Sequence, residues 1–438
     1  MYQSNSERYV SLREAAVWNG VVPDRFPDAI ARPGDRAEVP ALVADASREG
    51  KRIAVKSGGH SWRGAGLRDG GLLLDLGDLD RVEVLPDREL AFVEPGATHK
   101  VLADALVPHG LGFPIGHCPT VGLGGYLLAG GYGWNPRIWG PACWSVVGLD
   151  VVDIAGGELH ISADEHPDLF WAARGGGSGF PAIATRFHLR VQPLPRIASL
   201  RSDYPLASLA ELTTWSSSQE QLPPGTEISL IAHRPLDDEG RRVPAATVQA
   251  SGFAATPDAA MRLARNASDA APAVDLRVAQ RAYPEVALND LEGEGAWVQG
   301  VRYCVDMCWV DSRYYEVGAI CERAIENAPS QKSRIVLAWG FAPPDGPDVA
   351  QTANGKLTIN LYAIWDDPAD DDRNEAWIRW IMAELEPGIS GFYVGEADLS
   401  VSADRPRRCY PADKWERLTE IRERYDPERR KYGYLSED

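Results

Sequence analysis

Two glycine-rich segments constrain this chain more than any other feature of its sequence. The first reads Ser-Gly-Gly-His-Ser at residues 57–61, and the second reads Gly-His-Cys-Pro-Thr-Val-Gly-Leu-Gly-Gly at residues 116–125. Glycine lets the backbone pass close to a flat or anionic ligand and adopt positive φ at little steric cost. Because each segment holds a nucleophilic side chain, His60 or Cys118, the pair predicts a large bound cofactor.

These segments resemble the flavin-attachment motifs of the berberine-bridge-enzyme-like oxidases, which have the vanillyl-alcohol-oxidase (PCMH) type of FAD-binding fold. In that family the histidine of Gly-Gly-His and the cysteine of Gly-x-Cys each bond covalently to the flavin ring. The resemblance therefore implies the bicovalent subgroup, with FAD attached through His60 and Cys118. It extends over about residues 27–193, including Leu-Phe-Trp-Ala-Ala-Arg-Gly-Gly-Gly at 169–177, and over 391–427. Between these regions it is weak.

Both segments supply candidates for contacts with the cofactor. The resemblance implies that the main-chain N–H groups of residues 57–61 converge on the FAD pyrophosphate, because contiguous amides can form a concave anion site. Taken singly, each residue also fits an ordinary turn glycine, a turn-capping histidine or an inert buried thiol. The combination favours a cofactor site. Its candidate residues are Ser57, Gly58, Gly59, His60, Ser61, Gly116, Cys118, Gly122, Gly124 and Gly125.

The hydrophobic pattern predicts an α+β protein. Short strand segments alternate with turns between residues 52 and 93, after a helix at about 35–49. The dense glycines at 122–133 lack the strand, helix and ribose-binding acid of a dinucleotide-binding unit, which excludes a Rossmann fold. In the second half, longer strands such as 357–365 alternate with helices such as 374–384. This layout suits an antiparallel sheet with helices on one face.

A break at Pro-Leu-Pro, residues 193–195, marks the expected domain boundary. We expect a two-lobed architecture with a PCMH-type FAD-binding domain at 1–195. A substrate-binding domain with the antiparallel sheet would follow at 196–400. The C-terminal segment, 401–438, is expected to return to the FAD-binding domain, because its Arg-Leu and Tyr-Asp-Pro residues resemble the returning helix of the family.

Charge and composition restrict the partners. The 438 residues carry 45 Lys and Arg against 63 Asp and Glu, and this net charge of −18 opposes binding to nucleic acid and to anionic membranes. No run of about eighteen apolar residues occurs, and residues 1–18 lack an apolar signal-like core. We therefore expect a cytoplasmic protein that acts on a small molecule.

Cysteine spacing argues against disulfides and metal sites. Six cysteines are too few for a disulfide framework at this length, so most are expected to be free thiols. Cys304, Cys308 and Cys321 lack the paired Cys-x2-Cys knuckles and nearby histidines of a structural zinc site. The acidic run at 366–372 lacks the glycine and terminal glutamate of a calcium loop. No metal is expected.

Substrate oxidation also requires a base that accepts an O–H or N–H proton. In the family this group comes from a Tyr-x-Asn-Tyr or Tyr-x-Asn-Glu segment on a strand that faces the flavin, and residues 393–396 read Tyr-Val-Gly-Glu here. Glu396 is the candidate base if burial raises its pKa, although Gly395 replaces the family's asparagine. A solvated carboxylate is the alternative. Tyr362 and Tyr303 are secondary candidates for the catalytic pocket, with core packing as their alternative.

These features predict an FAD-dependent oxidase. A hydride would pass from a C–O or C–N centre of a small organic substrate to the bicovalently bound flavin, and dioxygen would accept the electrons. Three alternatives stay open: a flavin dehydrogenase with another acceptor, an oxidative cyclase of a secondary-metabolite pathway, and a non-catalytic binding protein that keeps the fold without functional flavin.

Overall fold

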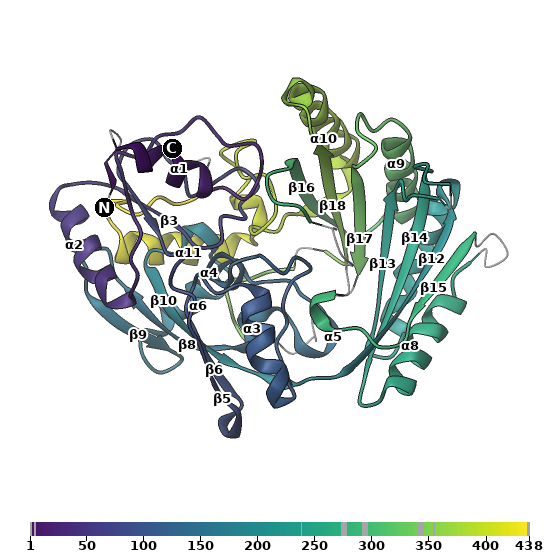
Figure 1. Cartoon of the computed structure of the whole chain (residues 1–438), viewed down its shortest axis with the longest axis horizontal. Coiled ribbons are helices and arrows are strands. Elements are labelled where there is room, and N and C mark those ends of the chain that lie inside the picture. The colour runs from purple at the N-terminus through teal and green to yellow at the C-terminus, as the bar shows by residue number, and fades with distance from the viewer. Residues whose placement is uncertain are drawn as a thin grey trace.

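The computed structural model describes residues 2–3, 6–237, 239–272, 278–290, 297–339, 346–353 and 355–435. Helices and sheets are mixed along the chain (Figure 1), so the predicted α+β class is confirmed. Within these residues, no helix combines the length and the apolar character that crossing a bilayer requires. The two chain ends lie on the same side of the molecule, near helix α1 (Glu7–Ala15).

The first glycine-rich turn follows a small mixed sheet with strand order β1-β2-β4-β3. Strands β2 and β3 each pair in parallel with β4, whose four residues are all buried. The strands are β1 (Tyr2–Gln3), β2 (Ala29–Ala31), β3 (Ile53–Lys56) and β4 (Leu72–Asp75). Because β3 ends at residue 56, the sheet holds the backbone of residue 57 at its edge.

A second sheet, entirely antiparallel, has five strands in the order β5-β6-β10-β8-β9. Leu149 and Val151 of β8 are buried in the main hydrophobic core, whereas Asp150 between them points to the opposite face and is partly exposed. The strands are β5 (Val82–Leu85), β6 (Leu90–Val93), β8 (Val146–Val152), β9 (Glu158–Ser162) and β10 (Ile183–Arg190). Two short strands, β7 (Leu111–Gly112) and β11 (Gln192–Pro193), form a separate antiparallel pair.

The second half of the chain forms an eight-stranded sheet in the order β15-β12-β14-β13-β17-β18-β16-β19. Every pairing in it is antiparallel, as the sequence predicts. The strands are β12 (Arg196–Pro205), β13 (Thr226–His233), β14 (Ala245–Ala254), β15 (Ala279–Tyr283), β16 (Arg302–Val310), β17 (Arg334–Trp339), β18 (Leu357–Trp365) and β19 (Ile389–Gly391).

The two faces of this large sheet have different surroundings. Alternate residues such as Leu230 and Leu361 are fully buried in the core, together with helical side chains such as Ile325 and Ile381. The intervening residues face the other way, toward the N-terminal half. Figure 1 shows α8, α9 and α10 on the outer side of the sheet. The helices of this half are α7 (Leu209–Ser216), α8 (Pro257–Asp269), α9 (Tyr314–Glu326) and α10 (Asp371–Leu385).

Five further helices lie in the N-terminal half of the described chain, and two of them, α4 and α5, were not predicted. Helix α4 lies inside the second glycine-rich segment, where glycine disfavours a helix. It forms because Leu123 and Leu127 are fully buried in the core, so tertiary packing outweighs propensity. These helices are α2 (Val39–Arg48), α3 (His99–Leu106), α4 (Leu123–Ala129), α5 (Pro136–Trp139) and α6 (Pro167–Ala173).

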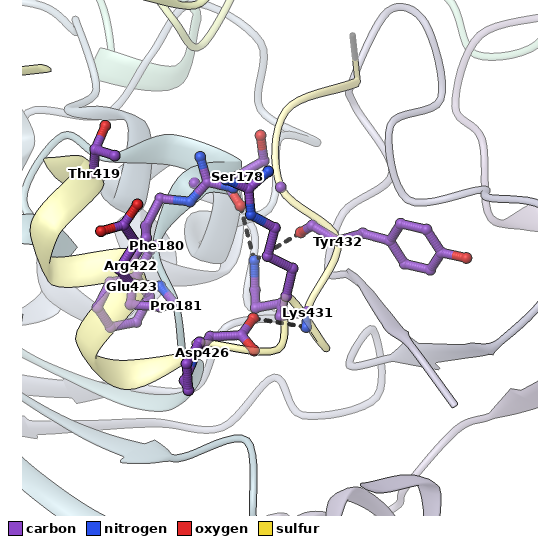
Figure 2. A pocket seen from close by; sticks show the side chains of 13 residues that line it. Ser178, Phe180, Pro181, Thr419, Arg422, Glu423, Asp426, Lys431 and Tyr432 are labelled. Carbon is purple, nitrogen blue, oxygen red and sulfur yellow. Dashed lines mark hydrogen bonds between the residues drawn. The ribbon is translucent and has the colours of Figure 1, made fainter. Parts of the chain in front are cut away.

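The C-terminal segment runs back beside β3. After α11 (Ala412–Tyr425), the backbone of residues 430–432 exchanges hydrogen bonds with Ile53 at 2.7 and 2.9 Å. The Asp426 carboxylate accepts bonds from the N–H groups of residues 430 and 431, and Lys431 Nζ donates to the Ser178 carbonyl at 2.9 Å. Figure 2 shows this turn around a small cavity of about 40 Å³. These bonds hold the segment that reaches the larger cavity described next.

Candidate functional site

A cavity of about 400 Å³ lies between the glycine-rich turns and the inner face of the eight-stranded sheet. All of the predicted cofactor-binding residues line it, from Ser57 to Gly125. Of the predicted catalytic residues, Glu396 and Tyr362 line it and Tyr303 does not. Residues 431–433 of the returning C-terminal segment complete one wall. The structure therefore brings both sequence segments and the Glu396 region to one cavity.

The two glycine-rich turns touch each other directly. A Cβ atom on Gly58 would lie 2.4 Å from the Gly122 nitrogen, and one on Gly122 would lie 2.5 Å from the Gly58 nitrogen. Neither position can accept a side chain without a backbone shift. The requirement for glycine at these two positions thus comes from the contact between the turns, and this contact holds the following nucleophiles at one wall.

His60 and Cys118 meet at the hydroxyl group of Thr120. The Thr120 Oγ1 atom lies 3.0 Å from His60 Nε2 and 3.3 Å from Cys118 Sγ, both within hydrogen-bonding distance. The His60 ring also stacks on Trp18, with a centroid separation of 4.5 Å. Sequence reasoning missed Thr120, although it stands two residues after Cys118 in the same segment. Only the structure shows that its hydroxyl contacts both nucleophiles.

Burial keeps the imidazoles of this wall neutral. It lowers the pKa of His60 from 6.5 to about 4 and that of His99 to about 3. His99 Nδ1 lies 3.1 Å from the Cys118 carbonyl oxygen, so α3 supports the cysteine turn from behind. A neutral imidazole carries a free lone pair and is the nucleophilic form. At neutral pH, His60 is therefore in the form that can attack an electron-poor ring.

Glu396 lies in a turn after β19. The family pattern predicts a strand here, but the N–H groups of residues 396 and 397 both donate to the Tyr393 carbonyl and close a turn. The Tyr362 hydroxyl donates to Glu396 Oε1 at 3.2 Å. Burial raises the pKa of the Glu396 carboxyl, and hydrogen bonds from Tyr362 and Trp62 act in the opposite direction. A carboxyl in this setting can accept a proton within the cavity.

Tyr303 has its polar groups engaged elsewhere. Its hydroxyl donates to the Val298 carbonyl at 3.0 Å and accepts from the Val298 N–H at 3.1 Å. The ring packs between Trp18 and Trp62, with centroids 5.4 and 5.3 Å away. Asn19 bonds to its backbone on both sides. This geometry agrees with core packing, the alternative given for Tyr303 above. The Tyr303 hydroxyl bonds to the Val298 backbone and is not part of the cavity wall.

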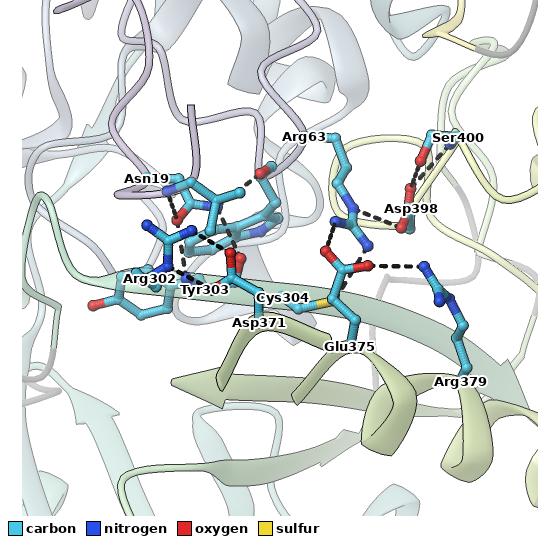
Figure 3. A network of polar contacts seen from close by, with 12 residues as sticks. Asn19, Arg63, Arg302, Tyr303, Cys304, Asp371, Glu375, Arg379, Asp398 and Ser400 are labelled. Atoms are coloured by element: carbon cyan, nitrogen blue, oxygen red, sulfur yellow. Dashed lines mark hydrogen bonds and ion pairs between the residues drawn. The ribbon is translucent and has the colours of Figure 1, made fainter. Parts of the chain in front are cut away.

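An arginine joins the first glycine-rich turn to the Glu396 turn (Figure 3). Arg63 Nε donates to Asp398 Oδ2 at 2.7 Å, and Nη1 donates to Glu375 Oε1 at 2.8 Å. Its Nη2 lies 3.3 Å from the sulfur of Cys304. Asp398 is 5% exposed and also accepts a bond from the Ser400 N–H. Arg63 therefore links residues on β16, on α10 and in the Glu396 turn.

The inner face of the large sheet contributes polar groups, of which sequence reasoning named only Tyr362. These side chains alternate along neighbouring strands, so they project into the cavity from one surface. The alternation of polar residues at 227 and 229 and at 358, 360 and 362 was the available signal. The polar residues that line the cavity from this face are Glu227, Ser229, Gln249, Thr358, Asn360 and Tyr362.

The cysteines agree with the sequence prediction. All six are free thiols, Cys118 is partly exposed, and the other five are buried. Burial raises the pKa of Cys304 and of Cys321 to about 12, so these two thiols stay protonated at neutral pH. Among the described residues, the cysteines form no group with the geometry of a metal site.

Comparison with known proteins gives a consistent result. The chain matches the FAD binding domain family over residues 27–162. The FAD-linked oxidoreductase ptmO of Penicillium ochrochloron is 30% identical over 436 residues, which cover 97% of this chain and 94% of that protein.

Solved structures share the fold over almost the whole chain. 6-Hydroxy-D-nicotine oxidase from Arthrobacter nicotinovorans matches with a TM-score of 0.83 and 24% identity, over 98% of this chain and 95% of that one. Phl p 4.0202, a glucose dehydrogenase, matches with a TM-score of 0.84 and 21% identity, over 99% and 96%. At these identities the likeness establishes the fold alone.

Proposed function

Because the chain belongs to the family of FAD-linked oxidoreductases, we propose that it is an oxidase that carries FAD bound covalently to both His60 and Cys118. Its substrate is a small organic molecule that is oxidised at a C–O or C–N centre. The observation that supports this proposal best is the meeting of His60 and Cys118 at Thr120, on the wall of the cavity. Separate turns of the chain converge there on a single polar atom.

The residues present fit the cofactor. In the described part of the chain, the main-chain N–H groups of residues 58–61 form no hydrogen bond with another residue, and all four residues line the cavity. Unpaired amides in residues that line a cavity are suited to an anionic group such as a pyrophosphate. Lys56 and Lys431 also line the cavity; Lys56 is paired with Asp75 at 2.9 Å, and Lys431 donates to the Ser178 carbonyl. Gly125 leaves open space where a side chain would otherwise stand.

The bound flavin supplies a hydride acceptor that can pass its electrons to dioxygen. The protein holds that group through His60 and Cys118, and it supplies the proton acceptor. Glu396 takes the O–H or N–H proton of the substrate onto its carboxylate, which Tyr362 orients through its hydroxyl. The polar inner face of the sheet binds and orients the rest of the substrate. The aromatic rings of Trp62 and Trp297 also line the cavity.

Covalent attachment is tested by acid precipitation and by the intact mass of the purified protein. We expect a yellow pellet and a mass increase of one FAD. His60→Ala and Cys118→Ala should each keep a yellow pellet through the remaining bond, and the double variant should release its flavin. His109→Ala, on an exposed histidine, is the matched control. Release of all flavin from the wild-type protein would contradict the proposal.

The electron acceptor is tested separately from attachment. We expect the substrate-reduced protein to reoxidise in air within a turnover and to form hydrogen peroxide. Stopped-flow mixing of the anaerobically reduced protein with oxygenated buffer measures this reaction. Slow reoxidation by oxygen, together with rapid reoxidation by a quinone dye, would instead show that the protein is a dehydrogenase.

We further propose the division of the chain into an FAD-binding domain at 1–195, a substrate-binding domain at 196–400 and a returning segment at 401–438. The hydrogen bonds between residues 430–432 and Ile53 support the return of that segment. A cytoplasmic location is likewise proposed, from the composition of the sequence.

A further inference from the structure

Three neighbouring strands of the five-stranded sheet bring two imidazoles and a carboxylate together outside the cavity. Asp150 of β8 pairs in register with His160 of β9, and His188 of β10 pairs with Gly148, two residues before Asp150. Residues two apart on a strand share a face, so the three side chains project from the same surface. None of the three lines the cavity.

The ligating atoms lie at distances that suit a metal ion. His160 Nδ1 is 3.1 Å from Asp150 Oδ1, and His188 Nε2 is 3.3 Å from the same oxygen. All three ligating atoms lie within 4.8 Å of one another. A tetrahedral ion with bonds of about 2.0–2.1 Å separates its ligand atoms by roughly 3.3 Å. The two measured oxygen–nitrogen distances match this separation.

The buried nitrogen of His188 provides an independent observation. Among the described residues, no group forms a well-oriented hydrogen bond with His188 Nε2, although this atom is shielded from solvent and directed at the Asp150 carboxylate. A buried polar atom without such a bond is costly unless a ligand or a water satisfies it. A metal ion would satisfy it.

Glycine leaves space for the two rings. A Cβ atom on Gly148 would lie 3.2 Å from His160 Cε1 and 3.3 Å from His188 Nδ1. The two imidazoles stack above this position with centroids 5.1 Å apart and an interplanar angle of 30°. Any larger residue at 148 would push the rings apart, so the pair depends on glycine at the centre of the site.

One oxygen of the Asp150 carboxylate faces the two histidines. Arg36 Nη1 donates to Oδ2 at 3.2 Å and leaves Oδ1 to the histidines. Arg186, the register partner of Asp150, pairs instead with Glu83 at 2.8 Å.

We propose that Asp150, His160 and His188 bind one zinc ion, with water completing the coordination. Two imidazoles and one carboxylate form a ligand set that suits zinc, which accepts nitrogen and oxygen ligands in a tetrahedral arrangement. The ion would join β9, at the edge of the sheet, to β8 and β10. Its role is structural, and it stabilises this sheet without taking part in the oxidation.

The test titrates zinc into tag-free, FAD-loaded protein that has been treated with EDTA and dialysed. Flavin-loaded protein is required because His60 and Cys118 could bind zinc themselves when no flavin occupies them. Calorimetry should show one equivalent of bound zinc, and cobalt should give the visible absorption of a tetrahedral site. Asp150→Asn, His160→Gln and His188→Gln should each weaken binding at least about tenfold. His109→Gln should leave it unchanged.

A second measurement does not depend on the folding of variants. In the wild-type protein, zinc should protect His160 and His188, but not His109, from modification by diethylpyrocarbonate, as mapped by mass spectrometry. Zinc should also raise the thermal midpoint of the wild-type protein, because a ligand that binds the native state stabilises it. Binding below half an equivalent, equal affinity in His188→Gln, or absence of protection would overturn the proposal.

Discussion

At the scale of single residues, one hydroxyl group relates the two nucleophiles to each other. Thr120 Oγ1 lies within hydrogen-bonding distance of both His60 Nε2 and Cys118 Sγ, so it restricts the orientation of both side chains. Burial also sets the protonation state of His60, because a pKa of about 4 leaves its imidazole neutral at neutral pH. Position and protonation state are thus set before any ligand arrives.

Thr120→Val removes this hydroxyl with little change in volume. Loss of a hydrogen bond with a net worth of about 1 kcal/mol should slow covalent flavin attachment roughly fivefold. The measurement is the time course of intact mass after FAD is added to flavin-free protein. Thr214→Val, at an exposed threonine of α7, should attach flavin at the wild-type rate. An unchanged rate in Thr120→Val would show that the hydroxyl does not position the nucleophiles.

The contact between Glu396 and Tyr362 predicts a shift in the pH profile. A base acts when it is ionised, so anaerobic flavin reduction should fall as the pH drops through the pKa of Glu396, which burial raises. Tyr362→Phe removes a hydrogen bond that lowers this pKa, so the acid limb should move to higher pH. Glu396→Gln should slow reduction roughly 10²- to 10⁴-fold without loss of flavin. The same acid limb in Tyr362→Phe as in the wild type would refute this assignment.

At the scale of structural elements, Arg63 connects segments that are far apart in the sequence. It leaves the first glycine-rich turn and pairs with Asp398 beside the Glu396 turn and with Glu375 on α10 (Figure 3). Asp398 also receives a hydrogen bond from Ser400, and its N–H donates to the buried Asp306. The nucleophile turn and the base turn therefore share one polar network.

Arg63→Gln should destabilise the protein by roughly 3 kcal/mol, because it leaves the nearly buried Asp398 carboxylate without its ion-pair partner. Urea unfolding followed by tryptophan fluorescence measures this change. Arg379→Gln is a matched control, since Arg379 also pairs with Glu375 but is 67% exposed and should cost less than about 0.5 kcal/mol. Equal costs for the two variants would show that the Arg63 network adds nothing beyond a surface ion pair.

At the scale of the whole molecule, buried histidines link stability to pH. Burial lowers the pKa of His99 to about 3 and of His233 to about 4, whereas an exposed imidazole titrates near 6.5. As the pH falls below about 6.5, these histidines bind protons in the unfolded chain but stay neutral in the folded chain. Stability from these groups is therefore complete above that pH and is lost progressively below it.

The free energy of unfolding should fall by up to about 1.4 kcal/mol per pH unit for each such histidine between about pH 6 and pH 4. Chemical unfolding at a series of pH values measures the slope. His99→Gln should reduce the slope of unfolding free energy against pH by the contribution of one proton, whatever its effect on absolute stability. His109→Gln should leave this slope unchanged. A slope that stays the same in His99→Gln would contradict the assignment.

Much of the fold could be predicted because its signals are local. Residues 357–365 form β18 as predicted from an apolar strand pattern, and the predicted antiparallel pairing of the second half is present throughout the large sheet. Helix α4 could not be predicted, since its glycines disfavour a helix and its burial depends on distant partners. The strand expected at Glu396 came from the family resemblance, and the structure has a turn there.

The sequence by itself determined the FAD-type glycine segments, their two nucleophiles and the α+β class, because each of these depends on neighbours within a few residues. Only the tertiary structure decided that Thr120 contacts both nucleophiles, that Tyr362 reaches Glu396 and that His160 and His188 meet at Asp150. Each of those contacts joins residues on different strands or turns, which strand pairing and reversals of the chain bring together. Register depends on the burial of whole strands, which no short sequence window contains.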